Sequence, residues 1–347
     1  MMDSAGTGIR YPWDAPPEHG KAIEVAEGVL WLRFPLPMAL DHVNIYALDE
    51  GDSWTIIDAG MHSKKTVAIW EQALAGPLGG KPVGRVILTH HHPDHVGMAG
   101  WFIARDAEFW TTRTAYLMSR MLILDVEHKV TPQVQQFWRR AGMIDEVFQK
   151  RINERPFNFA DMCHELPVGY QRVQQGDLIR AGGRDWDIHI GNGHAPEHLT
   201  MWSRDCNLVL SGDQILPSIS PNIGVHATEP DADPLDDWME SCTRLQALAR
   251  EEHLVLGGHK LPFTGLPTRM HQLIENHHGC LRRLRDHLAT PKTAADCFPP
   301  LFKRKIDGGT YGLALVEAVA HLNHLYQTNE VSRSLREDGA WLWQMKG

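Results

Sequence analysis

The chain has 347 residues, which is enough for one large domain with an extension or for two domains. It is 43% hydrophobic and 22% charged, as is usual for a globular protein with a sizeable core. The formal net charge of −9 gives no general attraction to nucleic acid or to an anionic membrane. Because no segment reaches the roughly 18 apolar residues of a membrane span, we expect no membrane partner, and we find no secretory signal pattern at the N-terminus.

Cysteine and histidine usage set further expectations. The five cysteines are scattered, odd in number and free of any C-x-x-C pair. This pattern predicts reduced thiols and a cytoplasmic protein rather than a disulfide framework. The chain contains 21 histidines, so a single histidine carries little information. We interpret those in "ENHHGC" (275–280) and "HLNH" (321–324) as surface or packing residues.

The first third of the chain alternates between strand and helix patterns. Residues 1–20 contain three prolines and are predicted to form an irregular arm. Short runs rich in β-branched and aromatic residues, bounded by Gly and Asp, indicate strands. The predicted strands span residues 29–34, 43–48, 54–60 and 84–89, and the predicted helices span residues 64–74 and 93–104. The helix at 93–104 begins with Pro93, which is tolerated in the first turn.

The middle of the chain changes character and then returns to strands. Residues 112–160 carry apolar side chains at helical spacing, for example Val134, Phe137 and Trp138, and are predicted to form a helical insertion. Strand patterns recur at 185–193, 199–203, 207–213 and 252–260, with a helix at 236–249. The order of elements predicts an α/β fold made of two similar halves.

The last 80 residues follow another pattern. Residues 268–288 and 311–327 each place apolar side chains on one helical face, and 330–345 has two strand-like runs around Glu337-Asp338-Gly339. Helices followed by a hairpin are typical of a winged-helix module. The helix at 311–327 has no Arg or Lys, so we favour packing or a homodimer contact over nucleic-acid binding for this module.

The segment "THHHPDH" (89–95) carries the strongest chemical signal. His90, His92, Asp94 and His95 have the spacing H-x-H-x-D-H directly after a predicted strand. A loop can turn His90 and His92 toward one point, while Asp94 and His95 serve a second point nearby. Imidazole and carboxylate both bind zinc, at about 2.0–2.2 Å. Two metal ions would need more ligands than this one segment supplies.

Three later segments offer the missing ligands. "GNGHAPEHL" contains His194, "LSGDQIL" contains Asp213 and "LGGHK" contains His259. Each candidate follows a predicted strand and has a neighbouring glycine, which lets the backbone turn sharply and approach closely. The sequence therefore predicts one site assembled from separate parts of the chain.

These segments, together with "IIDAG" (56–60), resemble the metallo-β-lactamase superfamily of metallohydrolases. The resemblance covers about residues 25–265, and "THHHPDH" resembles most the hydroxyacylglutathione hydrolase branch. It implies an αββα sandwich of two mixed sheets flanked by helices. The implied domains are the arm at 1–20, a catalytic domain at 21–265 and a winged-helix-like C-terminal module at 266–347.

The resemblance also implies residue roles. His90, His92 and His194 would hold one divalent metal ion, and Asp94, His95 and His259 a second. Asp213 would bridge the two ions, and Asp213 and Asp94 would orient the attacking water. Asp58 would be a supporting carboxylate, and His198 would lie near the site without binding metal. Zinc suits these ligands best, and iron and manganese are compatible.

The expected activity is hydrolysis of a small ester or thioester. Histidine at position 92 departs from the carboxylate pattern of diiron oxygen reductases on this fold, which favours hydrolysis over redox chemistry. Leu216 stands where acyl-homoserine lactonases of the family have tyrosine, which weakens a lactonase assignment. A phosphodiesterase or nuclease, a lactonase or β-lactamase-like hydrolase, and a metal-bearing regulatory or binding protein are the alternatives.

Overall fold

The computed structural model describes residues 2–3 and 8–347, so residues 1 and 4–7 of the predicted arm lie outside the described residues. The chain forms two compact units. Unit 1 comprises Met1–Val126, Asn158–Pro221 and Arg244–Met270, and unit 2 comprises Glu127–Phe157, Asn222–Thr243 and His271–Gly347. In the part of the chain that the structure describes, every helix is too short or too polar to cross a membrane.

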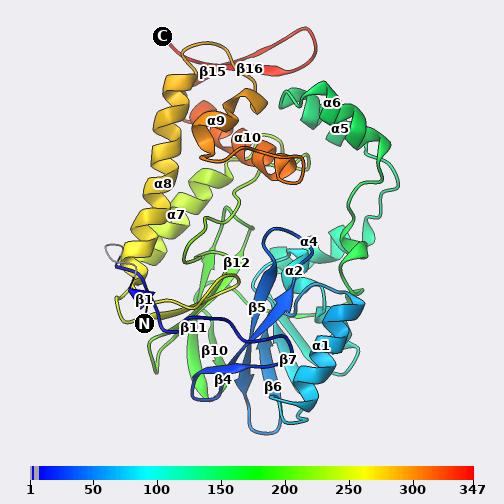
Figure 1. Ribbon diagram of the computed structural model, residues 1–347, viewed down its shortest axis with the longest axis vertical. Helices are drawn as coiled ribbons and strands as arrows, with labels where there is room; N and C mark the ends of the chain where they lie inside the picture. Colours follow the sequence, from blue (N-terminus) through cyan, green and yellow to red (C-terminus); the bar gives the residue numbers. More distant parts are fainter. Residues whose placement is uncertain (1, 4–7) are drawn as a thin grey trace. The chain divides into compact units, whose positions relative to one another are not determined.

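A seven-stranded sheet forms one half of unit 1 (Figure 1). Its strands lie side by side in chain order: β3 (Ile23–Ala26), β4 (Val29–Pro35), β5 (His42–Asp49), β6 (Trp54–Ile57), β7 (Val83–Ile87), β8 (Glu108–Thr111) and β9 (Gln171–Arg172). Pairing is antiparallel from β3 to β6 and parallel from β6 to β9. The C-terminal ends of the parallel strands β6 and β7 therefore lie together on the same side of the sheet.

A five-stranded sheet forms the other half of unit 1. It contains β10 (Leu178–Ala181), β11 (Arg184–Gly191), β12 (His198–Ser203), β13 (Leu208–Gly212) and β14 (Leu254–Gly257). Only the last pair, β13 and β14, is parallel. A short pair of strands, β1 (Met2–Asp3) and β2 (Arg10–Tyr11), lies outside both sheets. The predicted fold class, two mixed sheets flanked by helices, is confirmed.

Alternating side chains of both sheets form one shared core. Trp31 and Tyr46 of the seven-stranded sheet belong to the same buried cluster as Trp186, Ile188 and Met201 of the five-stranded sheet. Strands β4 and β5 are buried on both faces, which explains why their sequences are apolar almost throughout. The two sheets are held together mainly by burial of these apolar surfaces.

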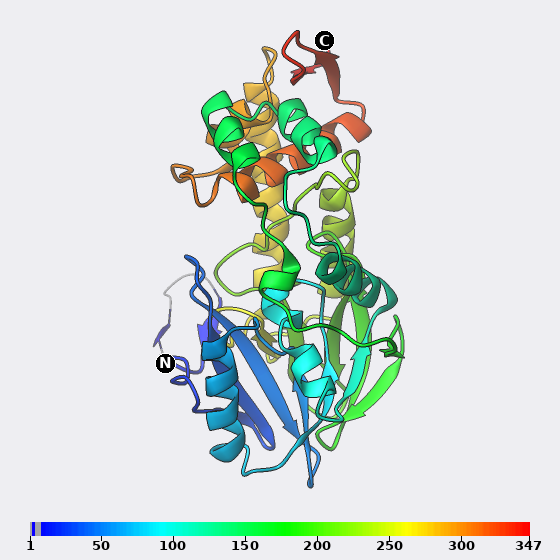
Figure 2. The ribbon, with the colours of Figure 1, turned by 90° about the vertical axis from the view of Figure 1, so that its right-hand side faces the viewer.

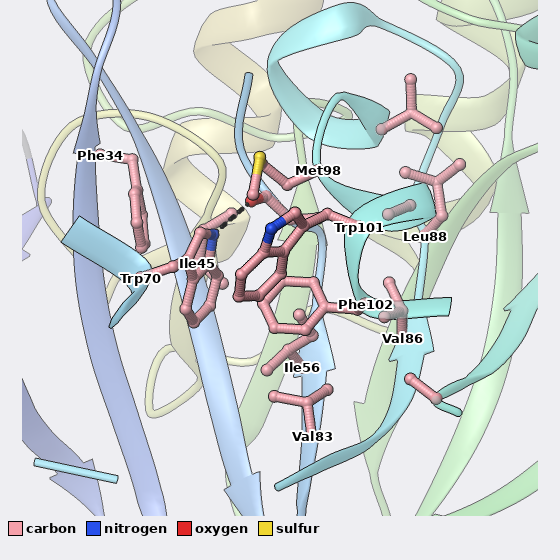
Figure 3. Close-up of a cluster of buried hydrophobic side chains, with 14 of the residues drawn as sticks. Phe34, Ile45, Ile56, Trp70, Val83, Val86, Leu88, Met98, Trp101 and Phe102 are labelled. Atoms are coloured by element: carbon pink, nitrogen blue, oxygen red, sulfur yellow. Dashed lines mark hydrogen bonds between the residues drawn. The ribbon is translucent and has the colours of Figure 1, made fainter. Parts of the chain in front are cut away.

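A second core lies between the seven-stranded sheet and the helices on its outer face. The helix α1 (Lys64–Ala75) lies along this sheet (Figure 2) and begins at the N-cap Ser63, whose Oγ accepts the Thr66 N–H at 3.0 Å. Trp70 packs against Phe34 and Phe102, with ring centroids 4.5 and 4.8 Å apart (Figure 3). Its Nε1 donates to the Ala59 carbonyl at 2.9 Å, which fixes the chain just after β6.

The prediction of one continuous helix at 93–104 is wrong. The structure has two short helices instead, α2 (Pro93–Val96) and α3 (Ala99–Ile103). The Met98 N–H donates to the Gly60 carbonyl at 2.8 Å, so a tertiary contact replaces the next helical hydrogen bond. A Cβ at Gly97 would lie 2.6 Å from the His62 nitrogen, so only glycine permits this approach.

Helices predominate in unit 2. The predicted helical insertion at 112–160 is divided between the two units. Its ends, α4 (Arg113–Leu124) and the 3₁₀ turn Phe159–Asp161, belong to unit 1. Its middle, α5 (Pro132–Arg140) and α6 (Asp145–Asn153), belongs to unit 2. The unit boundaries fall within α7 (Pro234–Gln246) and α8 (Leu266–His287). The remaining elements are the 3₁₀ turn Ala295–Cys297, α9 (Phe298–Leu301), α10 (Tyr311–Gln327), β15 (Val331–Leu335) and β16 (Trp341–Met345).

The hairpin predicted near the C-terminus is confirmed, since β15 pairs with β16 antiparallel. Eleven of the 17 residues of α10 are buried, which agrees with a packing role for this helix. A helix with so little free surface and neither Arg nor Lys is poorly suited to reading a DNA groove. The winged-helix assignment and the predicted domain boundaries stay predictions.

Candidate metal centre

Asp58 organises the loop that carries the first histidines. It follows β6, and its backbone has φ of 64°. Its Oδ1 accepts the Thr89 N–H at 2.7 Å and its Oδ2 accepts the Thr89 hydroxyl at 2.8 Å. The same Oδ2 lies 2.7 Å from Nδ1 of His95. Asp58 therefore ties the end of β6 to the loop after β7 and orients His95, as a supporting carboxylate would.

His90, His92 and His194 form one group of potential ligands, with ligand atoms within 4.8 Å of one another. The Nε2 of His90 lies 3.0 Å from the Nδ1 of His92, and the ring centroids of His92 and His194 are 4.6 Å apart. Burial, together with the neighbouring histidines, holds the pKa values of His90 and His92 well below the usual range. Both imidazoles are therefore neutral at pH 7, which is the form that binds metals.

Asp94, His95 and His259 form a second group within the same distance. The Oδ2 of Asp94 lies 3.4 Å from Nε2 of His259 and 3.7 Å from Nε2 of His95. The Nδ1 of His259 lies 2.7 Å from the His42 carbonyl, which fixes the ring and leaves Nε2 facing the carboxylates. Burial lowers the pKa of His259, but Asp213 and Asp94 outweigh it and raise that pKa to about 10.

Asp213 touches both groups. Its Oδ2 lies 3.0 Å from Nε2 of His259 and 3.7 Å from Nε2 of His194, while its Oδ1 lies 3.5 Å from Nε2 of His95. Burial raises the pKa of Asp213, but His259 and His95 outweigh burial and hold the pKa well below its usual range. Asp213 is therefore a buried carboxylate placed to serve two ligand groups.

His198 positions Asp213 and does not belong to any of the three ligand groups found among the described residues. Its Nε2 accepts the Asp213 N–H at 3.1 Å, and its ring stacks on His90 with centroids 4.6 Å apart. Burial and the neighbouring His194 lower its pKa to about 3, so the ring remains a neutral acceptor. This placement agrees with the expected position near the site.

Two glycines leave the room that the site needs. At Gly258 a Cβ would overlap the Oδ1 of Asp213 and lie 2.7 Å from Cε1 of His95. At Gly212, where φ is 49°, a Cβ would lie 2.6 Å from Cε1 of His198. The glycines next to Asp213 and His259 thus act as the sequence predicted, because any side chain there would push the ligands apart.

The donor set fits divalent metal ions. The Nε2 of His95 and the Oδ1 of Asp213 are buried, and among the described residues neither makes a hydrogen bond with good geometry. Buried polar atoms of this kind are costly unless they have a partner. Nitrogen and carboxylate oxygen atoms are ligands that zinc, iron and manganese accept. A third ligand group, His90, His95 and Asp213, shares His90 with the first group and His95 with the second, so cations bound there would lie close together.

Cys163, which the charge of Asp94 influences, is not poised as a nucleophile. Cys163 is buried, and burial together with the charge of Asp94 raises its pKa to about 12. Its sulfur is therefore protonated at neutral pH and a poor nucleophile.

All seven predicted ligands and both supporting residues come together in unit 1, from five separated segments. Their roles as ligands stay predictions. Sequence reasoning missed three residues of β5 that hold the 257–260 turn. Asn44 Nδ2 donates to the carbonyls of Gly257 and Lys260 at 3.0 and 2.7 Å, the Tyr46 hydroxyl donates to Gly257 at 3.0 Å, and His42 supplies its carbonyl to His259. Asn44, a polar residue within the otherwise apolar strand "HVNIYAL" (42–48), was the one sign in the sequence of this supporting role.

Comparison with known proteins gives two family matches. Residues 38–107 match the model described as "Metallo-beta-lactamase superfamily", and residues 281–346 match "Metallo-beta-lactamase-like, C-terminal domain". A probable metallo-hydrolase of Bacillus subtilis, YqjP, is 26% identical over 318 residues, which is 86% of this chain and 92% of that protein.

Solved structures extend the similarity over almost the whole chain. A beta-lactamase domain protein from Burkholderia ambifaria has a TM-score of 0.89 at 35% identity, covering 97% of this chain and 98% of that one. A metallo-beta-lactamase family protein from Thermus thermophilus, TTHA1429, has a TM-score of 0.78 at 24% identity, covering 93% and 100%. The second similarity concerns the fold alone.

Proposed function

The chain belongs to the metallo-β-lactamase superfamily of metallohydrolases, and from this premise we propose that it uses two divalent metal ions to hydrolyse a small ester or thioester. The observation that carries the proposal is the position of Asp213. Its two carboxylate oxygens face histidines of both ligand groups at 3.0–3.7 Å. A carboxylate so placed suits a bridge between two ions.

The residues divide into two sets of ligands. His90, His92 and His194 would hold one ion, and Asp94, His95 and His259 the other, with Asp213 shared. Zinc is the proposed metal because its usual ligands are histidine nitrogen and carboxylate oxygen. Iron and manganese accept the same ligands, and elemental analysis of protein purified without added metal distinguishes the three.

When bound, the two ions would supply a water of lowered pKa and a Lewis acid for the oxygen that gains charge. The chain prepares its own groups for this chemistry. Asp58 and the His42 carbonyl accept from the Nδ1 atoms of His95 and His259, so the Nε2 atom of each ring faces the carboxylates, where a metal ion would replace its proton. Asp94 is only partly buried, and its carboxylate can orient a water and accept a proton from it.

Three observations favour a carboxylic ester or thioester. The thiol of Cys163, whose pKa the charge of Asp94 helps to raise, is protonated, so it would not replace a metal-bound water as the nucleophile. The net charge of −9 disfavours a polyanionic phosphodiester substrate. Leu216, three residues after Asp213, is fully buried and apolar, so it offers no hydroxyl to a lactone.

The proposal is tested with a panel of substrates on metal-loaded and chelator-treated protein. The panel contains p-nitrophenyl esters, an acyl thioester followed by thiol release, a lactone, and bis(p-nitrophenyl) phosphate. We expect ester or thioester turnover that chelation abolishes and zinc restores. Turnover of the phosphodiester alone would reject the substrate class. Absence of turnover of every substrate in fully metal-loaded protein would instead favour a regulatory or binding protein.

A further inference from the structure

A cavity of about 330 Å³ lies within unit 2. Its walls come from α5, the segment 227–231, α10 and the hairpin of β15 and β16, and all of its lining residues belong to unit 2. None of them belongs to the candidate metal centre. The volume falls at the lower end of the range of about 300–1,000 Å³ that is usual for small-molecule sites.

Polar and charged side chains line part of the cavity, and aromatic and apolar side chains line the rest. Phe137, Val319 and Trp343 line it and are buried, and Trp341 lines it while half-buried. Indole and phenyl rings offer large flat surfaces on which a planar ligand can stack. The cavity therefore favours a ligand with an aromatic ring over a flexible or purely polar one.

Two guanidinium groups lie over the same indole. The guanidinium carbon of Arg333 is 4.5 Å from the centroid of the Trp341 ring, and that of Arg140 is also 4.5 Å from it. Both arginines line the cavity. Contact with an aromatic face holds a guanidinium in place without using its N–H donors, which stay available to a ligand.

The two arginines differ in their charge partners. Arg333 Nη1 donates to the Asp231 carboxylate at 3.0 Å, so its charge is compensated. Arg140 Nη1 donates only to the Gly339 carbonyl, at 3.4 Å. Over the described residues no carboxylate forms an ion pair with Arg140. The cavity thus presents one cation that lacks a counter-charge.

Hydrogen bonds within the chain fix the wall that residues 230–232 and α10 form. The Asn323 side chain donates to the carbonyls of Pro230 and Ala232 at 3.0 and 2.9 Å, and Gln327 donates to the Asp231 carbonyl at 2.7 Å. These bonds tie the 230–232 segment to α10. Because these walls are already fixed, little conformational entropy is lost when a ligand binds.

We propose that this cavity is a second ligand site, which binds a small aromatic carboxylate. The ring would pack against Phe137, Val319 and Trp343, beside the Trp341 indole that the two guanidinium groups cover, and the carboxylate would accept from the guanidinium of Arg140. A nucleic acid would need several unpaired cations, and here there is one. A neutral aromatic compound would leave Arg140 without a counter-charge. The site is independent of the proposed hydrolase activity.

The test compares 2-naphthoate with its neutral analogue 2-naphthamide by isothermal titration calorimetry. The full-length protein is first treated with chelator, because a carboxylate also binds metal ions. We expect one naphthoate per chain, bound at least tenfold more tightly than naphthamide, since a hydrogen bond to a charged partner is worth roughly that factor or more.

Variants assign the preference to the cavity. Arg140→Met should weaken naphthoate binding about tenfold and leave naphthamide binding unchanged, whereas Arg140→Lys should keep most of the preference. Arg139→Met is the matched control, because Arg139 has the same charge and helix but packs on Phe148 at 4.7 Å and does not line the cavity. Trp341→Ala should weaken the binding of both naphthoate and naphthamide.

Three results would overturn the proposal. These are absence of naphthoate binding at millimolar concentration, equal affinity for the acid and the amide, and equal effects of the Arg139 and Arg140 variants. Circular dichroism and melting temperature establish that each variant is folded. Arg140 is partly exposed, so its replacement should not disturb the core.

Discussion

Unit 1 and unit 2 each contain a buried group of histidines, and only one of them is arranged to bind metal. The Asp213 cluster of unit 1 comprises His90, His92, Asp94, His95, His194, Asp213 and His259. The His277 cluster of unit 2 comprises His277, His321 and His324, with His277 and His321 stacked at 5.3 Å between ring centroids. All three ligand groups found among the described residues lie in the Asp213 cluster.

The difference lies in the partners of the imidazoles. In the His277 cluster, His277 Nδ1 lies 3.2 Å from His321 Nε2, and His321 Nδ1 donates to the Glu317 carbonyl at 2.8 Å. The Nδ1 of His324 lies 3.1 Å from the Asp233 carboxylate, and one buried nitrogen of the cluster makes no hydrogen bond to any described residue, Nε2 of His277. One nitrogen cannot replace the three or four ligands that zinc requires. Clustered histidines therefore indicate a metal site only when carboxylates and several unpaired atoms face the same point.

The charge state separates the carboxylate side of the Asp213 cluster from the His277 cluster, although burial keeps His90 and His92 neutral. Asp213 and Asp94 outweigh burial and raise the pKa of His259, so carboxylates there attract positive charge. In the His277 cluster burial dominates and lowers the pKa values of His277 and His321 to about 3 and 4. The first environment favours a cation, and the second excludes one.

Asp213→Asn should have the largest effect, because it removes the carboxylate that distinguishes the clusters. We expect hydrolytic turnover to fall roughly a thousandfold, which corresponds to about 4 kcal/mol of lost stabilisation. Bound metal, measured by mass spectrometry of the dialysed protein, should fall from about two ions per chain to one or fewer. Asp52→Asn, at an exposed position in unit 1, is the control. Unchanged metal content in the Asp213 variant would contradict the bridging role.

Asp58→Asn should have the next largest effect. The amide has a single acceptor oxygen, so it cannot accept both the Thr89 N–H at the Oδ1 position and the His95 Nδ1–H at the Oδ2 position, and either the loop or the His95 ring loses its support. Partners of metal-binding histidines typically contribute about 10- to 100-fold to affinity or activity. Metal titration of the chelated protein measures the change. An affinity equal to that of the unsubstituted protein would make Asp58 only a structural residue.

Gly258→Ala should weaken metal binding by about tenfold without replacing any ligand, since overpacking costs roughly 1–3 kcal/mol. The new Cβ would displace the Asp213 carboxylate and crowd His95. Gly257→Ala is a close control, because its Cβ would lie 3.3 Å from the nearest atom, the Ile215 carbonyl oxygen. If both variants bound metal equally well, the space around Asp213 would not limit the site.

His277→Asn tests the cluster that excludes charge. Its pKa in the folded state, about 3, lies below that of the unfolded chain, so its contribution to stability is complete above pH 6.5 and is lost as the pH falls. Between pH 8 and pH 5 the loss should be about 2 kcal/mol. Urea unfolding of chelated protein at both pH values should show a smaller loss for this variant. His278→Asn, at an exposed neighbour, should behave as the unsubstituted protein.

Much of the site could be predicted from the sequence because its ligands are chemically distinctive and follow strands. His90, His92, Asp94 and His95 lie within six residues, and the glycines beside Asp213 and His259 marked sharp turns. The break between α2 and α3 could not be predicted, because it depends on the Met98 N–H bonding to Gly60 and not within its own helix. The support that Asn44 and Tyr46 give to the 257–260 turn was hidden for the same reason.

The sequence alone determined the α/β class, the hairpin near the C-terminus and which side chains are able to bind metal, because periodicity and residue chemistry are local properties. Only the tertiary structure decided that residues 90–95, 194, 213 and 259 meet within a few ångströms, and that His277 and His321 pair with each other while the neighbouring His324 faces a single carboxylate, that of Asp233. Sheet pairing and side-chain packing join segments more than 100 residues apart, and no local pattern encodes those distances.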